Sequence, residues 1–371
     1  MKILLCFGTR PEAIKMAPLF HEFKKNNFDV KVCVTAQHRE MLDQVLVFFE
    51  IVPDYDLDLM QPNQTLNGLS AHILSKMDEV LLNEKPNLVL VHGDTTTSSM
   101  VALAAFHLGI KVGHVEAGLR TYNKKAPFPE ELNRQLTSRI VDFHFTPTAQ
   151  ATLNLLSEGI DENTIIETGN TVVDALFWTL NKIEALDYNH PEIEALENSI
   201  PQNKKVVLVT GHRRENFGEG FQQLCEALLT IAEREDVTII YPVHLNPNVK
   251  DIVYGMLSNN TNIQLIPPVS YPAFVWLMKR SFIIISDSGG IQEEAPSLGK
   301  PVLVSRDVSE RPEGVAAGFS FLVGTNQDKI VKTAHRLLTN FNGFENQINP
   351  YGKGDSVKKI VKYLLNFTLK K

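Results

Sequence analysis

A glycine-containing stretch in the second half of the chain could hold a phosphate group. Residues 286–294 read SDSGGIQEE and follow the apolar run 282–285. Backbone N–H groups at the start of a helix favour an anion, and three residues here can expose them: Ser288, Gly289 and Gly290. One of the carboxylates that follow, Glu293 or Glu294, could accept both hydroxyl groups of a ribose. The same glycines would also serve a plain helix entry, and the Gly-Lys-Ser/Thr ending of a P-loop is missing.

Carboxylates that could act as general acids or bases gather in the first half. Asp94 and Glu116 each lie just past a short apolar run. If the two runs are neighbouring strands, about 4.8 Å apart, the carboxylates converge, and one of their pKa values would be pushed towards neutrality. Glu130 and Glu131 could add a third carboxylate. Asp94 could equally be the N-cap of a helix that begins near Thr95, because aspartate is a favoured cap.

Basic side chains at similar positions suit an anionic ligand. Arg10 and Lys15 lie in the loop and helix that follow the first apolar run, and Arg311 lies in another such loop. His212 and Arg213 directly follow the run 206–210, and an arginine can grip a phosphate with two donors. An isolated Arg or Lys at a helix start is ordinarily solvated, so the position after the strand is what favours a function.

The sequence argues against several cofactors. No spacing of the HExxH kind predicts a metal site, and no GxGxxG follows the first run of either half, which argues against tightly bound NAD. No Ser or Cys lies in a nucleophile elbow. The three cysteines are far apart and indicate no disulfide framework. We therefore expect no metal and no cofactor.

The candidate phosphate-binding, acidic and basic residues share a setting, because they lie after short apolar runs that alternate with helical patterns. The runs of the first half are 2–7, 30–35, 88–91, 112–115, 143–146 and 165–167, and those of the second are 206–210, 238–241, 263–266, 282–286, 301–304 and 319–323. Such runs are typical of parallel strands buried on both faces, and ligands bind at the carboxyl ends of those strands. Two series predict an α/β protein with two Rossmann-like, doubly wound domains facing across a cleft.

Length and composition agree with this organisation. The chain has 371 residues, of which 43% are apolar and 21% charged. We expect a first domain at 1–177, a linker at 178–205, a second domain at 206–355 and a C-terminal helix at 356–371 that packs back on the first domain. The net charge of −7 argues against nucleic acid as a partner. No apolar run reaches the roughly 20 residues of a membrane helix. The three separate cysteines fit a reducing cytoplasm, where we expect the protein to be.

The motifs, taken together and in order, resemble those of the non-hydrolysing UDP-N-acetylglucosamine 2-epimerases. They are GTRPEAIKMAP, TAQHREMLDQVL, VHGDTTT, GHVEAGLRT, PEELNR, TGNTVVDAL, TGHRRENFG, YPVHLNPNV and SDSGGIQEEAPSLGKPVL. The match runs along almost the whole chain, which makes it far more specific than any one motif. The resemblance implies a GT-B type fold, a homodimer without a nicotinamide cofactor, and reversible interconversion of UDP-GlcNAc and UDP-ManNAc for bacterial surface polysaccharide.

The chemistry of this reaction limits its route. The C2 proton of the sugar is not acidic, since no carbonyl lies beside it, and without NAD the enzyme cannot easily oxidise C3. The remaining route eliminates UDP to form 2-acetamidoglucal, protonates the other face and adds UDP back. It needs carboxylates near the sugar, cations on the diphosphate and a closed cleft.

The matching motif positions imply roles for individual residues. Asp94, Glu116 and Glu130 resemble the acid–base set, and His212 resembles the histidine that eases UDP departure. The implied substrate-binding residues are Arg10, Lys15, Phe274, Ser288, Gly289, Gly290, Glu294 and Arg311. Among these, the resemblance assigns residues 288–290 to the phosphate, Glu294 to the ribose, and Phe274 and Arg311 to the uracil and the cleft.

Some members of this family carry a second, activating UDP-GlcNAc site. The candidate allosteric residues that match it are Gln37, His38, Arg213 and His244. Glu40 stands where strongly regulated members tend to have glutamine, and a carboxylate near a diphosphate argues against the regulation here.

Three other functions share many of these features. A hydrolysing epimerase would let water trap the intermediate and release ManNAc. A GT-B glycosyltransferase would need an acceptor pocket and usually an apolar face towards a membrane. A non-catalytic nucleotide-sugar sensor would have no need of the acid–base set.

Overall fold

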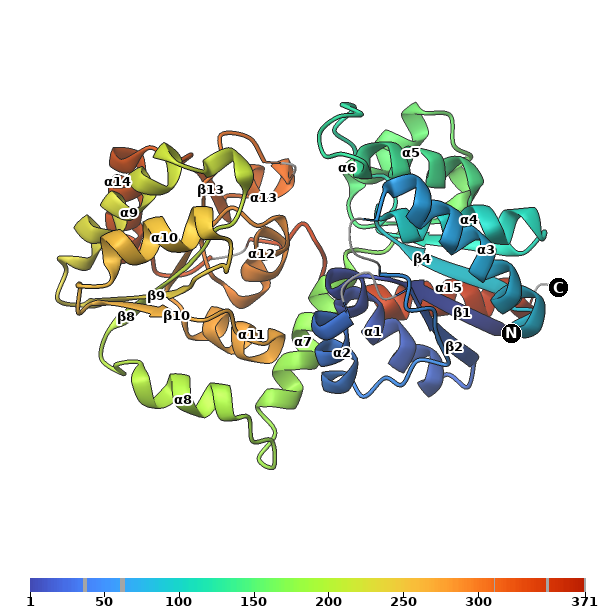
Figure 1. The fold of residues 1–371 in the computed structure, drawn as a ribbon, viewed down its shortest axis with the longest axis horizontal. Helices are drawn as coiled ribbons and strands as arrows, with labels where there is room; N and C mark the ends of the chain where they lie inside the picture. Colours follow the sequence, from blue (N-terminus) through green and yellow to red (C-terminus); the bar gives the residue numbers. More distant parts are fainter. Residues whose placement is uncertain (36–38, 61–63, 310, 345–346, 370–371) are drawn as a thin grey trace. The chain divides into compact units, whose positions relative to one another are not determined.

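The computed structural model divides the chain into two compact units. The first comprises Met1–Trp178 and Tyr351–Lys371, and the second comprises Thr179–Pro350. The structure describes residues 1–35, 39–60, 64–309, 311–344 and 347–369. Each unit is built on a parallel sheet with helices on both of its faces (Figure 1). The predicted α/β class with two doubly wound sheets is confirmed.

Seven strands form the sheet of the first unit within the described residues, in the order β3-β2-β1-β4-β5-β6-β7. They are β1 (Lys2–Phe7), β2 (Asp29–Val34), β3 (Tyr55–Asp56), β4 (Leu88–His92), β5 (Lys111–Val115), β6 (Phe143–Thr146) and β7 (Ile165–Glu167). The chain order reverses between β1 and β4, which makes the ends of these strands the place where a doubly wound sheet binds ligands. The buried strand interiors explain the continuous apolar runs of the sequence.

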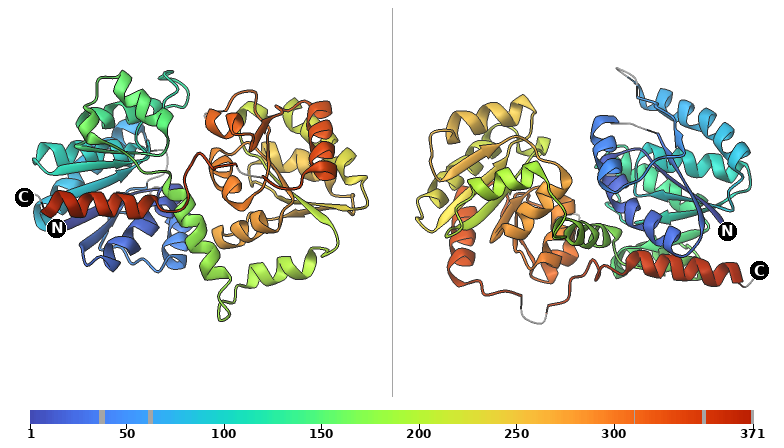
Figure 2. Two further views of the ribbon diagram at one scale, coloured as in Figure 1. Left: turned by 180° about the vertical axis from the view of Figure 1, so that it is seen from behind. Right: turned by 90° about the horizontal axis from the view of Figure 1, so that it is seen from below.

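The helices of the first unit cover both faces of its sheet, and several begin at a capping threonine. They are α1 (Arg10–Lys25), α2 (Arg39–Phe48), α3 (Leu66–Glu84), α4 (Thr96–His107), α5 (Glu130–Ile140), α6 (Ala149–Ser157), the short η1 (Glu162–Thr164), α7 (Thr171–Ile183) and α15 (Ser356–Leu369). Thr9 and Glu12 form a capping box that starts α1. Ile360 and Leu364 of α15 are fully buried, and this helix packs on α1 beside the sheet of the first unit (Figure 2).

The second unit has a six-stranded sheet in the part of the chain that is described, in the order β10-β9-β8-β11-β12-β13. Its strands are β8 (Lys205–Thr210), β9 (Val237–Pro242), β10 (Ile263–Ile266), β11 (Ile283–Ser286), β12 (Val302–Val304) and β13 (Ser320–Leu322). Its helices are α8 (Pro191–Ser199), η2 (Arg214–Asn216), α9 (Glu219–Ala232), α10 (Pro247–Leu257), α11 (Tyr271–Arg280), α12 (Gly289–Glu294), η3 (Ala295–Leu298), α13 (Pro312–Ala316) and α14 (Gln327–Asn340). In the described ranges, no helix has the length and apolar character needed to cross a membrane.

Candidate functional site

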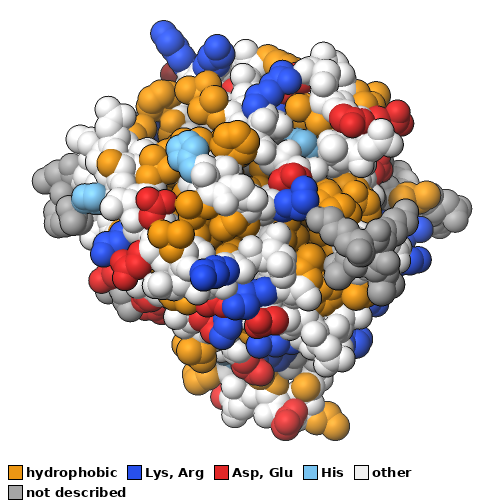
Figure 3. Space-filling model, turned by 90° about the vertical axis from the view of Figure 1, so that its right-hand side faces the viewer, with side chains coloured by type: hydrophobic (Ala, Val, Ile, Leu, Met, Phe, Trp, Pro, Cys, Tyr) orange, Lys and Arg blue, Asp and Glu red, His pale blue; other side chains and the backbone are white. Residues whose placement is uncertain are grey.

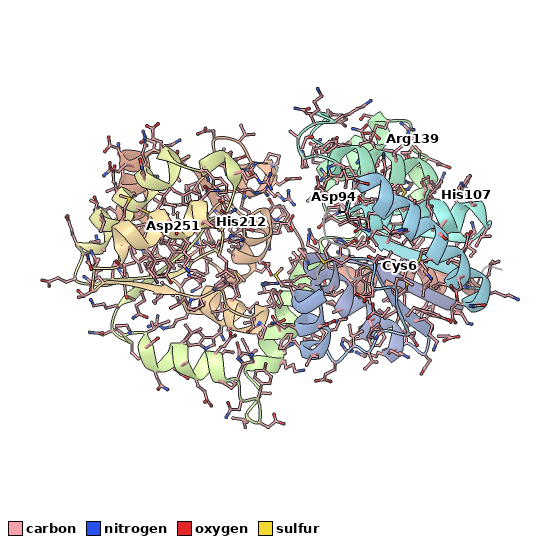
Figure 4. The ribbon with its side chains drawn as sticks, in the orientation of Figure 1. Cys6, Asp94, His107, Arg139, His212 and Asp251 are labelled. Carbon is pink, nitrogen blue, oxygen red and sulfur yellow. The ribbon has the colours of Figure 1, made fainter. Side chains whose placement is uncertain are left out.

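The ends of β4 and β5 bring the two predicted carboxylates of the first unit to the same edge of its sheet. The strands pair in parallel with His92 opposite Val115, so the loops that carry Asp94 and Glu116 leave the sheet side by side. Figure 4 places Asp94 just beyond the end of β4. The expectation that the two strands are neighbours is confirmed.

Glu116 combines a strained backbone with a buried ion pair. Its φ is +67°, in the left-handed region that glycine favours and that costs other residues about 1 kcal/mol or more. Its side chain is 9% exposed and forms an ion pair with Lys15 of α1. The same oxygen, Oε2, accepts a hydrogen bond of 3.0 Å from Asn170 Nδ2. Strain that persists at a strand end, on a residue bound to a cation, is typical of a functional site.

Asp94 is held by a cation of its own. Its carboxylate forms an ion pair with Arg134, which also lies 3.4 Å from Glu131, while Asn133 Nδ2 donates to the Asp94 carbonyl at 3.0 Å. Thr95 rather than Asp94 caps α4, with its Oγ1 accepting from Ser98 N at 3.1 Å. The N-cap alternative for Asp94 is therefore wrong. Asp94 and Glu116 thus each face a different cation, Arg134 and Lys15.

Glu130 and Glu131 differ sharply although they are adjacent. Glu130 begins α5 and is half-buried, whereas Glu131 is fully buried. Glu131 accepts backbone hydrogen bonds of 3.0 Å from Thr121 and Tyr122. Burial alone would raise the pKa of Glu131, but these hydrogen bonds, with help from Gln135 and Arg134, outweigh it and lower that pKa. Glu131 therefore holds a loop, which leaves Glu130 as the residue of this pair that could reach a ligand.

Two buried histidines lie directly beneath the carboxylates. Burial lowers the pKa of His92 to about 4 and that of His114 to about 3, so both rings are neutral near pH 7. His92 Nε2 lies 3.9 Å from Glu116 Oε2, and His114 Nε2 lies 2.6 Å from the Gly93 carbonyl. Their place near the ends of apolar runs can be read from the sequence, whereas their burial cannot.

In the second unit, the predicted phosphate loop follows β11 and begins α12. Ser288 is the N-cap of that helix, and its backbone N–H donates to Ser286 Oγ at 3.0 Å. A Cβ added to Gly289 would lie 3.1 Å from the guanidinium carbon of Arg311, so glycine is what permits this close approach. The resemblance implied a place for Arg311 near the uracil and the cleft, and the structure packs its side chain against the predicted phosphate loop.

The two carboxylates of α12 have different partners. Glu293 Oε1 accepts from Arg311 Nε at 2.9 Å, and Glu294 Oε1 accepts from Tyr271 OH at 2.9 Å. Phe274 lies one turn after Tyr271 on α11 and is half-buried. Glu293 therefore supports Arg311, and Glu294 remains the candidate for a ribose.

His212 follows β8 and rests on a carboxylate that the sequence analysis had not singled out. Asp287 is fully buried, and its Oδ2 accepts from the backbone N–H groups of His212 and Arg213, both at 2.8 Å. Burial is the main cause that lowers the pKa of His212, and the nearby Arg213 and His244 lower it further. The Asp287 carboxylate acts in the opposite direction but does not outweigh them. The His212 ring stacks on His244 with centroids 5.5 Å apart (Figure 4 labels His212). An aspartate just after a buried strand was the available signal for Asp287.

Arg10 is the other predicted basic residue of α1. Arg10 begins α1 and is half-buried, on the same helix as Lys15. Gln37 and His38 lie outside the described residues. Among the residues that the structure describes, no three His, Cys, Asp or Glu side chains are placed to hold a metal ion.

Comparisons with known proteins decide the family. A family model described as UDP-N-acetylglucosamine 2-epimerase matches residues 21–365. The chain belongs to the UDP-N-acetylglucosamine 2-epimerase family. It is 53% identical to the UDP-N-acetylglucosamine 2-epimerase of Escherichia coli O157:H7 over 371 residues, which covers 99% of both chains. The predicted family is confirmed, and with it an isomerase activity.

Solved structures of relatives agree. The UDP-GlcNAc 2-epimerase of Neisseria meningitidis bound to UDP-GlcNAc is 51% identical with a TM-score of 0.91, covering 99% of this chain and 100% of that one. The enzyme of Methanocaldococcus jannaschii in complex with UDP-GlcNAc and UDP is 37% identical with a TM-score of 0.83 and the same coverage. A glycosyltransferase of kitacinnamycin, 11% identical with a TM-score of 0.60, shares the fold alone. The fold is thus of the GT-B type, as predicted.

Proposed function

We propose that the protein interconverts UDP-GlcNAc and UDP-ManNAc by eliminating UDP and adding it back, without releasing ManNAc to water. The observation that carries the proposal is Glu116, a buried carboxylate on a left-handed backbone and paired with Lys15, in a family whose relatives bind UDP-GlcNAc. Backbone strain of this kind clusters at active sites, and here it coincides with burial and an ion pair at the end of a strand.

The first unit supplies the acids and bases. In the elimination, a carboxylate removes the C2 proton while the C1–O bond to UDP breaks, which gives 2-acetamidoglucal. In the return step, an acid protonates C2 from the opposite face, and the diphosphate oxygen forms the bond to C1 again. Two faces need two proton-transfer groups, and the candidates are Asp94, Glu116 and Glu130, with Arg10 and Lys15 beside them.

The second unit holds UDP. Residues 288–290 would bind the diphosphate, with Arg311 packed against Gly289. Glu294 would accept the ribose hydroxyls, and Phe274 would lie near the uracil. His212, neutral near pH 7 and partly exposed, can donate one N–H to the leaving diphosphate. Arg213 and His244, which lie beside it, stay the predicted residues of a second nucleotide-sugar site.

The proposal includes a homodimer and a cytoplasmic location, with the product entering bacterial surface polysaccharide. The resemblance supports all three. For the dimer, exposed apolar side chains such as Phe106 on α4 and Leu136 on α5 lie on helices that pack together, and Figure 3 shows hydrophobic side chains among the charged ones on this side of the first unit. Sedimentation analysis would test the dimer.

Incubation with UDP-GlcNAc in deuterated water, followed by NMR, tests the reaction. We expect UDP-ManNAc that carries deuterium at C2, and free ManNAc would indicate a hydrolysing enzyme instead. In the same assay Glu116→Gln should lower turnover by about 10³-fold, because general acid–base groups contribute up to about 10⁴-fold. Glu22→Gln on α1 is the control. Near-normal turnover by Glu116→Gln would remove Glu116 from the mechanism.

A further inference from the structure

Asn170 contacts the carboxylate at the centre of the proposed site. It precedes α7 and is only 2% exposed. Its Nδ2 donates to Glu116 Oε2 at 3.0 Å, across 54 positions of sequence. Lys15 binds the same oxygen. The carboxylate is therefore fixed from two sides, by a charged donor on α1 and a neutral donor at the start of α7.

The other polar atoms of Asn170 join it to both places where the chain passes between the two units. Its Oδ1 accepts from Val172 N at 3.0 Å, which orders the first turn of α7, and α7 runs on through the boundary at Trp178. Its backbone N–H donates to the carbonyl of Tyr351 at 2.8 Å, and Tyr351 is where the chain re-enters the first unit.

The packing around this point is close. Gly169 has a φ of +92°, and a Cβ added there would lie 3.4 Å from the Tyr351 carbonyl oxygen and 2.7 Å from Ser356 Oγ. Asp174 on α7 accepts from the backbone N–H groups of Ser356 and Val357 at 3.2 and 3.3 Å. The returning segment is thus bonded to Asn170 before Gly352 and to Asp174 of α7 after it.

We propose that Asn170 is a positioning residue that sets Glu116 for proton transfer and couples its placement to the two chain crossings at α7 and Tyr351. The coupling follows from one side chain bonding the carboxylate, the start of α7 and, through its backbone, the returning segment. The inference rests on the proposed role of Glu116.

The test is Asn170→Asp, which keeps the shape and the acceptor for Val172 N but replaces the donor with a second carboxylate. The groups that face Glu116 are the charged Lys15 from α1 and the neutral ring of His92 from β4, and Asp94 from the loop after β4 acts in turn on His92. The variant adds negative charge to this group and removes a donor from the charged form of Glu116. The acidic limb of the kcat profile should therefore move to higher pH by about one unit or more. We expect kcat at pH 7 to fall at least tenfold, while KM for UDP-GlcNAc changes less than twofold.

Two further variants keep the inference open to refutation. Asn170→Ser can cap Val172 but cannot reach Glu116, so it should show a smaller shift of the same sign even if Asn170→Asp folds poorly. Asn26→Asp is the matched control, because Asn26 Nδ2 also donates to a carboxylate, that of Glu22 at 3.1 Å, at the far end of α1. It should leave the profile in place.

The outcomes separate the two proposals. If Glu116→Gln is inactive but both Asn170 variants keep the parental profile, or lose kcat without any shift, Asn170 is only structural. If Glu116→Gln retains near-normal turnover, the proposed role of Glu116 fails first.

Discussion

The two units organise the ends of their strands by different means. In the first unit, Glu116 and Asp94 are each compensated by a basic side chain, Lys15 and Arg134. In the second, Arg311 and Glu293 form one such ion pair, but the buried Asp287 carboxylate has no pairing lysine or arginine among the described ion pairs and accepts backbone N–H groups from the loop that carries His212. A site built from side-chain charges depends on the identity of each partner, whereas a site built from backbone donors depends on the path of the loop.

The largest effect should come from removing a compensating charge in the first unit. Lys15→Met takes from the buried Glu116 carboxylate its cation and leaves the neutral donor Asn170, which should cost about 3 kcal/mol of unfolding free energy. The chain has two tryptophans, Trp178 in the first unit and Trp276 in the second, so a Trp276→Phe background lets urea denaturation report on the first unit. Lys31→Met, which breaks the exposed pair with Asp54, should leave the midpoint nearly unchanged. If Lys15→Met and Lys31→Met shifted the urea midpoint equally, the buried ion pair of Glu116 would not be what organises the first unit.

The next effect concerns acid stability of the first unit. Burial lowers the pKa of His114 to about 3, below the usual 6.5, so below pH 6.5 the unfolded chain binds a proton that the folded one does not. This group therefore costs the folded state about 1.4 kcal/mol for each pH unit between about 6 and 4. His114→Gln should remove that slope, measured by urea denaturation at several pH values. His212→Asn should change the slope less, since His212 is 44% exposed.

In the second unit, the corresponding change is Asp287→Ala. It leaves the N–H groups of His212 and Arg213 without their acceptor and should cost about 2 kcal/mol, read from Trp276 fluorescence in a Trp178→Phe background. Asp287→Asn keeps an acceptor oxygen of the same shape and should cost clearly less. If the asparagine variant were as unstable as the alanine one, charge rather than the loop path would organise this unit too.

The smallest effect isolates the backbone of Glu116. Both Glu116→Gly and Glu116→Ala remove the carboxylate, but only glycine relaxes at a φ of +67°. Glu116→Gly should therefore be the more stable variant by about 1 kcal/mol, the reverse of the usual order of these residues. Thermal denaturation of the two proteins compares them directly, and a more stable alanine variant would rule out backbone strain at this position.

Much of the fold could be predicted because its signals are local. Buried parallel strands require continuous apolar runs, and the ends of those runs identified where Asp94, Glu116, His212 and residues 288–290 would lie. The two-residue strand β3 was missed, since Tyr55–Asp56 is too short to form a pattern.

The partners within the site could not be predicted in the same way. Arg134 and Asn170 meet Asp94 and Glu116 from 40 and 54 positions away, and no local pattern encodes that distance. The left-handed conformation of Glu116 was equally hidden, because such a backbone is ordinarily indicated by glycine. Tertiary contacts decide these features, and they are the ones on which the proposed chemistry depends.

The division of the chain has a consequence for its synthesis. The second unit is one continuous segment, Thr179–Pro350, whereas the first unit needs α15, whose buried Ile360 and Leu364 are added to the nascent chain only after that segment is complete. During translation the first unit is therefore incomplete, and the surface that α15 will cover stays exposed. The second unit can form its whole core in that time. The first unit, although its synthesis starts first, therefore completes its fold after the second unit. A chaperone that binds exposed apolar surface would find that surface on the first unit until α15 has been added.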